Sequence, residues 1–201
     1  MQKRNGRDAL IGFVGSDTDL DLVQQIAAKV PNMSAGGVVL APWPQCEALL
    51  TLEKPLVAAD SPGLAIDSPG AMHAGDTLKI TVRSPSQISY LYVAYIQADG
   101  SVVHLAQPNG VVPQPTLPNQ TLVFGDGLEG RTKFTVGPPF GPEMVIAVAS
   151  RSPLFDAKLQ PVQTEREYLT ALRRALIYKP SPDMPDREVT AAIKMLQTSA
   201  R

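Results

Sequence analysis

One stretch, residues 90–105, constrains the fold of this chain more than any other. Residues 90–96 read YLYVAYI, which places apolar residues on both alternating faces, as is typical of a strand covered on both sides. Asp99 and Gly100 follow, and this pair favours a hairpin because a type I′ turn needs positive φ angles. Residues 102–105 (VVHL) form the return strand. The stretch therefore predicts a β-hairpin.

The flanking segments add strands at short, regular spacing. In residues 77–83, Leu78, Ile80 and Val82 share one face and polar residues the other, which predicts a half-buried strand. Turns rich in Gly and Pro, including a rigid turn at 137–142, separate the further predicted strands, which are 121–124, 132–136 and a central strand at 144–149. Six or seven such strands predict an antiparallel β-sandwich or barrel.

A helix and one ambiguous segment follow these strands. Thr164 and Glu167 form a capping box, and an apolar stripe predicts a helix as far as Ile177. The stripe consists of Tyr168, Leu169, Leu172 and Leu176. We expect the helix to be stopped by residues 181–185 (SPDMP). Residues 189–198 fit either a helix or a strand, and we prefer a terminal strand.

The first fifty residues have the pattern of a small β-α-β unit. Residues 9–14 and 38–40 predict strands, and Ser16 or Asp17 caps a helix between them. One face of that helix carries Leu20, Val23, Ala27 and Val30. Pro44 suits the first turn of a second, short helix. A unit of this size needs a neighbouring surface to bury its apolar residues, and we expect the polar residues 1–8 to form a disordered tail.

These patterns predict an α+β protein, mainly an antiparallel β-sandwich with a C-terminal helix, preceded by a small β-α-β unit. Residues 55–74 change character, because SPG occurs twice, at 61–63 and 68–70, around one short edge strand at 64–66. We therefore expect an α/β unit at 1–54, a connector at 55–74 and a β-sandwich domain with its helix at 75–201.

The composition argues against some partners. The formal net charge of −1 argues against a nucleic-acid-binding surface, because binding phosphates needs an excess of basic residues. No run reaches the roughly 20 apolar residues of a membrane span. Cys46 is the single cysteine, so no internal disulfide bond can form. Residues 1–8 lack the apolar core of a signal peptide, which predicts either a cytoplasmic protein or a segment of a longer chain in the periplasm or envelope.

Four separated motifs in order carry a resemblance to a known family. They are LYVAY at 91–95, DG at 99–100 with VVHL at 102–105, GPPFGPE at 137–143 and SRSPL at 150–154. Over residues 75–178 the chain resembles the bacterial domain of unknown function 4384. The resemblance implies an appended domain without established activity, often found beside caspase-like peptidases or Ser/Thr kinases in secreted or envelope proteins. Residues 1–50 resemble small periplasmic domains of the BON type.

Reactive side chains are few, and a structural role is the preferred interpretation for each. Cys46 with His73 or His104 suggests a nucleophile pair, but no family motif surrounds the cysteine. The alternating Asp17, Asp19 and Asp21 suggest a calcium loop whose later Gly and Glu are missing, so helix capping is preferred. Glycines at 125, 127 and 130 predict a tight turn or bulge rather than a phosphate cradle. We therefore predict no catalytic residue, cofactor or metal.

Partner contacts are the remaining functional hypothesis. Trp43, between two prolines, and Pro139 with Phe140, in the rigid turn, are the candidate contacts, although Phe140 is also interpreted as core. The tyrosines at 90, 92 and 95 are interpreted as packing rather than ligand stacking, with the first two on one face. The sequence favours a non-catalytic protein-interaction module of a bacterial protein. The alternatives are a small-molecule or glycan-binding module and a hydrolase using Asp126, His104 or Cys46.

Overall fold

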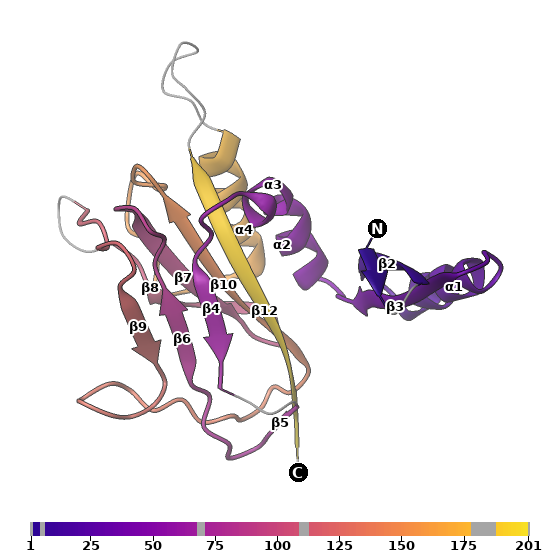
Figure 1. Cartoon of the computed structure of the whole chain (residues 1–201). Coiled ribbons are helices and arrows are strands. Elements are labelled where there is room, and N and C mark those ends of the chain that lie inside the picture. Colours follow the sequence, from indigo (N-terminus) through magenta and orange to yellow (C-terminus); the bar gives the residue numbers. More distant parts are fainter. Residues whose placement is uncertain (1, 5–6, 68–70, 109–112, 178–187, 201) are drawn as a thin grey trace. The chain divides into compact units, whose positions relative to one another are not determined.

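The computed structural model describes residues 2–4, 7–67, 71–108, 113–177 and 188–200. Contacts within the chain divide it into two compact units, Met1–Leu50 and Thr51–Arg201 (Figure 1). The division falls near the end of helix α2 (Gln45–Thr51), and residues 55–74, predicted as a connector, lie in the second unit. We describe each unit by itself.

Unit 1 is a three-stranded sheet with one helix. Strands β1 (Gln2–Arg4) and β2 (Arg7–Val14) are antiparallel, and β2 is parallel to β3 (Met33–Leu40), with α1 (Asp17–Ala28) between them in sequence. The predicted β-α-β unit is therefore confirmed. The expectation of a disordered tail over residues 1–8 is wrong for the described residues of that range, because Gln2–Arg4 pair with β2. Strand pairing uses backbone groups, so polar side chains do not prevent it.

Helix α1 begins where the sequence predicts but ends earlier, at Ala28. Ser16 is the N-cap, and its Oγ accepts a hydrogen bond from the Asp19 backbone N–H at 3.2 Å. The helix packs mainly against β3. Of the predicted inner face, Ala27 is buried and Leu20 and Val23 are half-buried, whereas Val30 is exposed. Val30 departs from the prediction because the helix already ends at Ala28.

Unit 2 contains a six-stranded sheet. Its strands are β5 (Met72–His73), β7 (Tyr90–Ile96), β8 (Ser101–Ala106), β10 (Pro142–Ser150), β11 (Val162–Thr164) and β12 (Val189–Ser199), in the order β11-β8-β7-β10-β12-β5. All neighbours are antiparallel except β12 and β5. The strand interpretation of residues 189–198 and the central position of 144–149 are both confirmed.

The β7–β8 hairpin forms as predicted, but its turn type differs. The Gly100 N–H donates to the Gln97 carbonyl at 3.0 Å, and the Gln97 N–H donates to the Ser101 carbonyl at 2.8 Å. Gly100 has a φ of 84°, whereas Asp99 is not among the described residues with positive φ. The loop is therefore a three-residue connection closed by a glycine bulge rather than a type I′ turn, which would need positive φ at both central residues.

A second sheet packs on the first. It contains β4 (Gly63–Ile66), β6 (Ile80–Arg83) and β9 (Thr121–Phe124) in the order β4-β6-β9, so the predicted edge strand at 64–66 is confirmed. The core between the sheets joins Ile80 and Val82 to Val93, Val145 and Ala147. Six-stranded and three-stranded layers, with this core between them, form the predicted sandwich.

The predicted strand at 132–136 does not form. Only isolated bridges occur there, from Thr135 to Thr77 and from Lys133 to Gly125 and Asp126. The neighbouring residues 125–130 contain three glycines at positive φ and form a tight turn instead of a straight strand. Backbone hydrogen bonds still join the segment to residues 75–78, from the Leu78 N–H to the Phe134 carbonyl and from the Val136 N–H to the Asp76 carbonyl. The alternating pattern therefore indicates local pairing here without a continuous strand.

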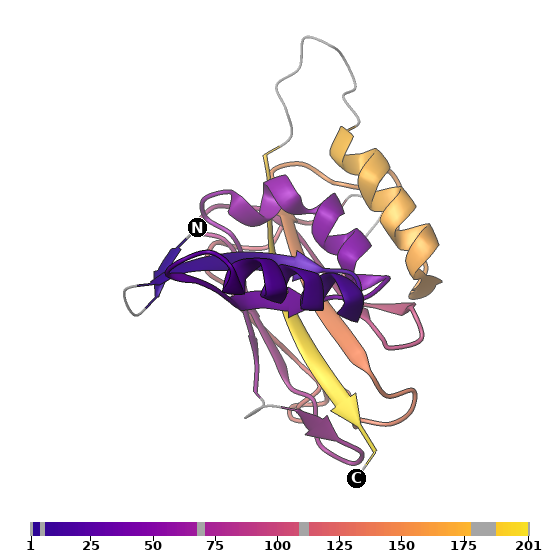
Figure 2. The same cartoon turned by 90° about the vertical axis from the view of Figure 1, so that its right-hand side faces the viewer.

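Helices cover the outer face of the six-stranded sheet (Figure 2). Helix α3 (Glu53–Val57) packs on β12, and α4 (Glu165–Ile177) packs on β8 and β11. Residues of β7 and β10 are consequently buried on both faces, and Ile146 and Val148 have no exposed surface. This mixed α+β architecture, mostly antiparallel with a helix near the C-terminus and a β-α-β unit at the start, confirms the predicted fold class.

The predicted capping box of α4 is present. The Thr164 N–H donates to the Glu167 carboxylate at 2.9 Å, and the Glu167 N–H donates to the Thr164 hydroxyl at 3.3 Å. Tyr168, Leu169 and Leu172 of the predicted stripe are buried, while Leu176 is half-buried. The predicted helix stop at 181–185 lies outside the described residues. In the described part of the chain, no helix is long and apolar enough to span a membrane.

Candidate functional site

Trp43 exposes more surface than the other predicted partner contacts. Its side chain lies in the segment before α2 and is 60% exposed, while Ala41 on one side and Gln45 on the other are buried. In unit 2, Pro139 is exposed, but Phe140 is half-buried and packs against the core between the sheets. An exposed indole whose neighbours in the chain are buried is held in position to act as an interface anchor.

Unit 1 also exposes apolar side chains that the sequence interpretation did not select. Ile11 and Val39 on the sheet are 54% and 53% exposed, and three residues of α1 and its C-terminal end, Leu22, Ile26 and Val30, are exposed as well. The spacing of the α1 residues, four apart, was the signal in the sequence. It was missed because Leu20, Val23 and Ala27 supply a second apolar face that accounts for the helix by itself.

Tyr92 of β7 has the packing role that the sequence predicts. Tyr92 is buried, its hydroxyl accepts a hydrogen bond from the Leu154 N–H at 2.8 Å, and its ring meets Phe155 edge-on with 5.2 Å between centroids. Tyr95 lies on the opposite face, where its hydroxyl donates to the Glu143 carboxylate. The predicted assignment of Tyr92 and Tyr95 to different faces is therefore confirmed.

Tyr95 and Glu143 line a cavity of about 290 Å³ in unit 2. Its other lining residues include Gln97, Leu105, Lys133 and Phe134. Burial raises the pKa of the Glu143 carboxyl, and hydrogen bonds from Tyr95, the Ala98 backbone and Thr198 oppose that increase. Burial also raises the pKa of the Tyr95 hydroxyl, with its hydrogen bond to Glu143 adding to the effect. Sequence reasoning missed this pair because its members lie 48 positions apart.

Two of the three proposed hydrolase residues, His104 and Asp126, contact a polar side chain. One ring nitrogen of His104 lies 2.9 Å from the Gln163 side-chain oxygen, its ring packs edge-on against Tyr168, and burial lowers its pKa. Asp126 forms an ion pair with Arg131 in the turn after β9. Cys46 is half-buried in unit 1. The structure thus shows structural contacts for His104 and Asp126 and does not join them into one cluster of contacts.

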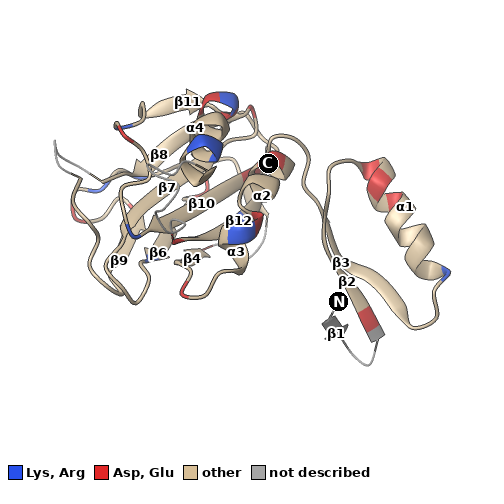
Figure 3. Ribbon diagram, turned by 90° about the horizontal axis from the view of Figure 1, so that it is seen from above, with Lys and Arg blue, Asp and Glu red and all other residues tan. Residues whose placement is uncertain are grey.

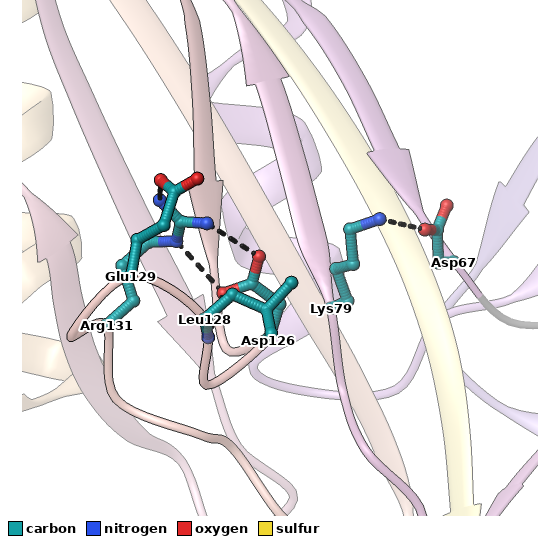
Figure 4. Close-up of polar contacts among 6 residues, drawn as sticks. All are labelled: Asp67, Lys79, Asp126, Leu128, Glu129 and Arg131. Carbon is teal, nitrogen blue, oxygen red and sulfur yellow. Dashed lines mark hydrogen bonds and ion pairs between the residues drawn. The ribbon is translucent and has the colours of Figure 1, made fainter.

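The glycine-rich turn after β9 is stabilised by charge (Figure 4). Arg131 donates from Nε to Oδ1 of Asp126 at 2.9 Å and from Nη2 to Oδ2 at 3.0 Å, and it also pairs with Glu129 at 2.7 Å. The hydrogen bonds from Arg131 lower the pKa of Asp126 to about 2. This geometry confirms the tight-turn interpretation of Gly125, Gly127 and Gly130. On the sheet beside it, Lys79 and Asp67 form an ion pair at 2.7 Å.

The remaining candidate sites also follow the structural interpretation. Asp17 and Asp19 lie in the first turn of α1, and the Ser16 hydroxyl donates to the Asp19 carboxylate at 2.7 Å. His73 lies 3.8 Å from the Asp76 carboxylate, with both side chains exposed. Within the described ranges, no group of three or more His, Cys, Asp or Glu side chains is arranged to hold a metal ion.

Comparison with known proteins identifies one family. Neither the curated proteins nor the solved structures that were compared match the chain. The family model described as "Domain of unknown function (DUF4384)" matches residues 71–153. The match covers the β7–β8 hairpin, the rigid turn and β10, and it includes the motifs at 91–105 and 137–154 except for Leu154. Residues 71–153 of this chain are therefore a domain of unknown function 4384.

Proposed function

We propose that the chain is a non-catalytic interaction module that binds a protein partner through the surface around Trp43. The observation that carries this proposal is the 60% exposure of the only tryptophan in the sequence. Exposing an indole to water forgoes a large hydrophobic gain, and tryptophan is enriched among the residues that dominate interface energies. The buried neighbours Ala41 and Gln45 hold the backbone on both sides of it.

The charge of the chain and the family match support the same proposal. The net charge of −1 makes a protein a better match than a nucleic acid. The family resemblance supports an accessory role in a bacterial protein of the envelope or secretion machinery. His104 and Asp126, which a hydrolase would use, are engaged in structural contacts, and this supports the non-catalytic part of the proposal.

The proposal is tested with the full chain as bait in affinity capture from source cells. We expect Trp43→Ala to lose the captured partner and Trp43→Phe to retain part of it, because phenylalanine keeps an aromatic anchor. Both variants should keep the wild-type circular dichroism, since the side chain is exposed. Capture that is unchanged by Trp43→Ala, in a folded protein, contradicts the proposal.

Phe140 and Pro139 are tested in the same capture experiment. Phe140 packs against the core, so Phe140→Ala should destabilise the fold in addition to any effect on binding. Pro139 is exposed, so Pro139→Ala should leave the core intact. A loss of capture in this variant would therefore indicate that the rigid turn contacts the partner. If neither variant alters capture in a folded protein, the partner does not contact the rigid turn.

A small-molecule site is the second candidate, and the cavity beside Tyr95 favours it. A volume of about 290 Å³ is near the lower end of ligand pockets, which span roughly 300–1,000 Å³. A buried carboxylate, an amide and two aromatic rings line it, which suits a small ligand with hydrogen-bond donors. Thermal unfolding with a panel of amines and sugars tests this candidate. Stabilisation that Glu143→Gln abolishes supports it, and no stabilisation by any compound argues against it.

A further inference from the structure

One flank of α1 carries two exposed apolar side chains one turn apart. Leu22 and Ile26 are 53% and 51% exposed, and Val30, two residues beyond the end of the helix at Ala28, is 40% exposed. Residues four apart on a helix are neighbours, so Leu22 and Ile26 form one stripe. At 3.6 residues per turn, the stripe is centred about a third of a turn from the buried Ala27. It therefore lies beside the face that packs on the sheet, where a second helix can reach it.

The two ends of this stripe have opposite charges (Figure 3). Asp17 and Asp19 lie in the first turn of α1, and Lys29 is its C-cap residue. Asp19 precedes Leu22 by three residues and Lys29 follows Ile26 by three residues, so both are in line with the stripe and equally far from its middle. An identical helix placed antiparallel along the stripe brings Asp19 of one copy to Lys29 of the other at both ends. The stripe is thus complementary to itself in charge as well as in apolar character.

We propose that α1 pairs antiparallel with α1 of a second copy of this chain, along the stripe formed by Leu22 and Ile26. Side chains at a spacing of four form the ridges by which helices commonly pack. A two-fold axis between the helices makes the contact isologous, so it closes as a dimer and does not extend into a filament.

The size of unit 1 gives a physical reason for this pairing. Unit 1 comprises residues 1–50, and domains this small bury a low fraction of their surface. Pairing two helices adds apolar burial without any new element in the chain. The inference does not depend on Trp43, so it stands or falls separately from the proposed function.

Sedimentation equilibrium of the full chain over a range of concentrations tests the pairing. We expect a monomer–dimer equilibrium in the wild type. Leu22→Asp and Ile26→Asp should each raise the dimer dissociation constant more than about tenfold, because each places an unpaired charge in the helix contact. Gln24→Asp is the matched control, since it adds the same charge to an exposed position on the opposite side of α1. Circular dichroism checks that the helix remains folded.

Charge reversal tests the antiparallel arrangement. Asp19→Lys and Lys29→Glu should each weaken the dimer, because each juxtaposes like charges at both ends of the stripe. An equimolar mixture of the two variants should dimerise more tightly than either alone, because both ends then pair opposite charges. Trp43→Ala should leave the dimer unchanged. A wild type that stays monomeric at every concentration, equal effects of Leu22→Asp and Gln24→Asp, or a mixture no tighter than its components each overturns the proposal.

Discussion

Glu143 is the buried acid of the second unit, and its environment shows how one residue connects several segments. Its carboxylate, on β10, accepts hydrogen bonds from Tyr95 on β7, from the Ala98 backbone in the hairpin loop and from Thr198 on β12. The residue is only 2% exposed. Burial disfavours the charged form because water cannot solvate it, and these hydrogen bonds recover part of that loss.

The raised pKa of Glu143 predicts a specific pH dependence of stability. The folded protein holds this proton more tightly than the unfolded chain does, so protonation of Glu143 contributes stability. That contribution is lost as the pH rises from the ordinary carboxyl pKa of 4.5 through the folded value. We expect the wild type to lose stability relative to Glu143→Gln over this range, as measured by urea unfolding. If the wild type instead becomes more stable relative to Glu143→Gln as the pH rises, the raised pKa of Glu143 is contradicted.

Two glycines of one turn make a matched pair of substitutions. A Cβ on Gly125 would lie 2.1 Å from the Leu78 carbonyl oxygen and 2.6 Å from the Phe134 ring, whereas a Cβ on Gly130 would meet nothing within 4 Å. Both residues have positive φ, 84° and 78°. Gly130→Ala should therefore cost about 1 kcal/mol from backbone strain alone. Gly125→Ala should lower the free energy of unfolding by more than about 2 kcal/mol, as measured by chemical denaturation. Equal losses of stability in the two variants would contradict the close packing around Gly125.

Among the secondary-structure elements, those with local signals were predictable from sequence. Ser16 and the Thr164–Glu167 pair mark helix starts that the structure confirms, because a cap depends on residues three apart. The strand at 132–136 and the hairpin turn type were wrong for a different reason. Pairing of residues 132–136 depends on the shape of the turn before it, and the loop type depends on the register of β7 and β8.

The capping box of α4 gives a test at this scale. Thr164→Ala removes the hydroxyl that accepts from the Glu167 N–H, and should cost about 1 kcal/mol of stability. Hydrogen bonds from the Thr164 backbone N–H and, to a smaller extent, from its hydroxyl lower the pKa of Glu167. The variant removes only the hydroxyl, so it should raise the Glu167 pKa part of the way to its ordinary value, as followed by NMR titration. Thr164→Ser keeps the hydroxyl and serves as the control; a Glu167 pKa unmoved by Thr164→Ala would contradict the box.

At the scale of the whole molecule, the main core belongs to one unit. Every residue of the core between the two sheets, from Leu64 to Leu196, lies within residues 51–201. A separate chain of residues 51–201 should therefore unfold cooperatively in urea with native near-ultraviolet circular dichroism. A gradual transition without aromatic signal would show that this core depends on residues 1–50.

The sequence predicted the class of the whole molecule better than its sites. Alternating strands and Gly/Pro turns indicated the sandwich, and the motifs indicated the family over residues 75–178, whereas the family model matches residues 71–153. The Tyr95–Glu143 pair and its cavity were missed, because contacts distant in sequence depend on strand order. Trp43 was selected from its residue type alone, and its exposure came only from the structure.

Site-specific photo-crosslinking in source cells tests the interaction proposal most directly. A photoreactive side chain at position 43 is compared with one at Val57, which is 84% exposed and is the control for unspecific apolar contact. The account predicts that position 43 crosslinks to one defined protein and that position 57 does not. No defined product from position 43, or the same products from both positions, would contradict it.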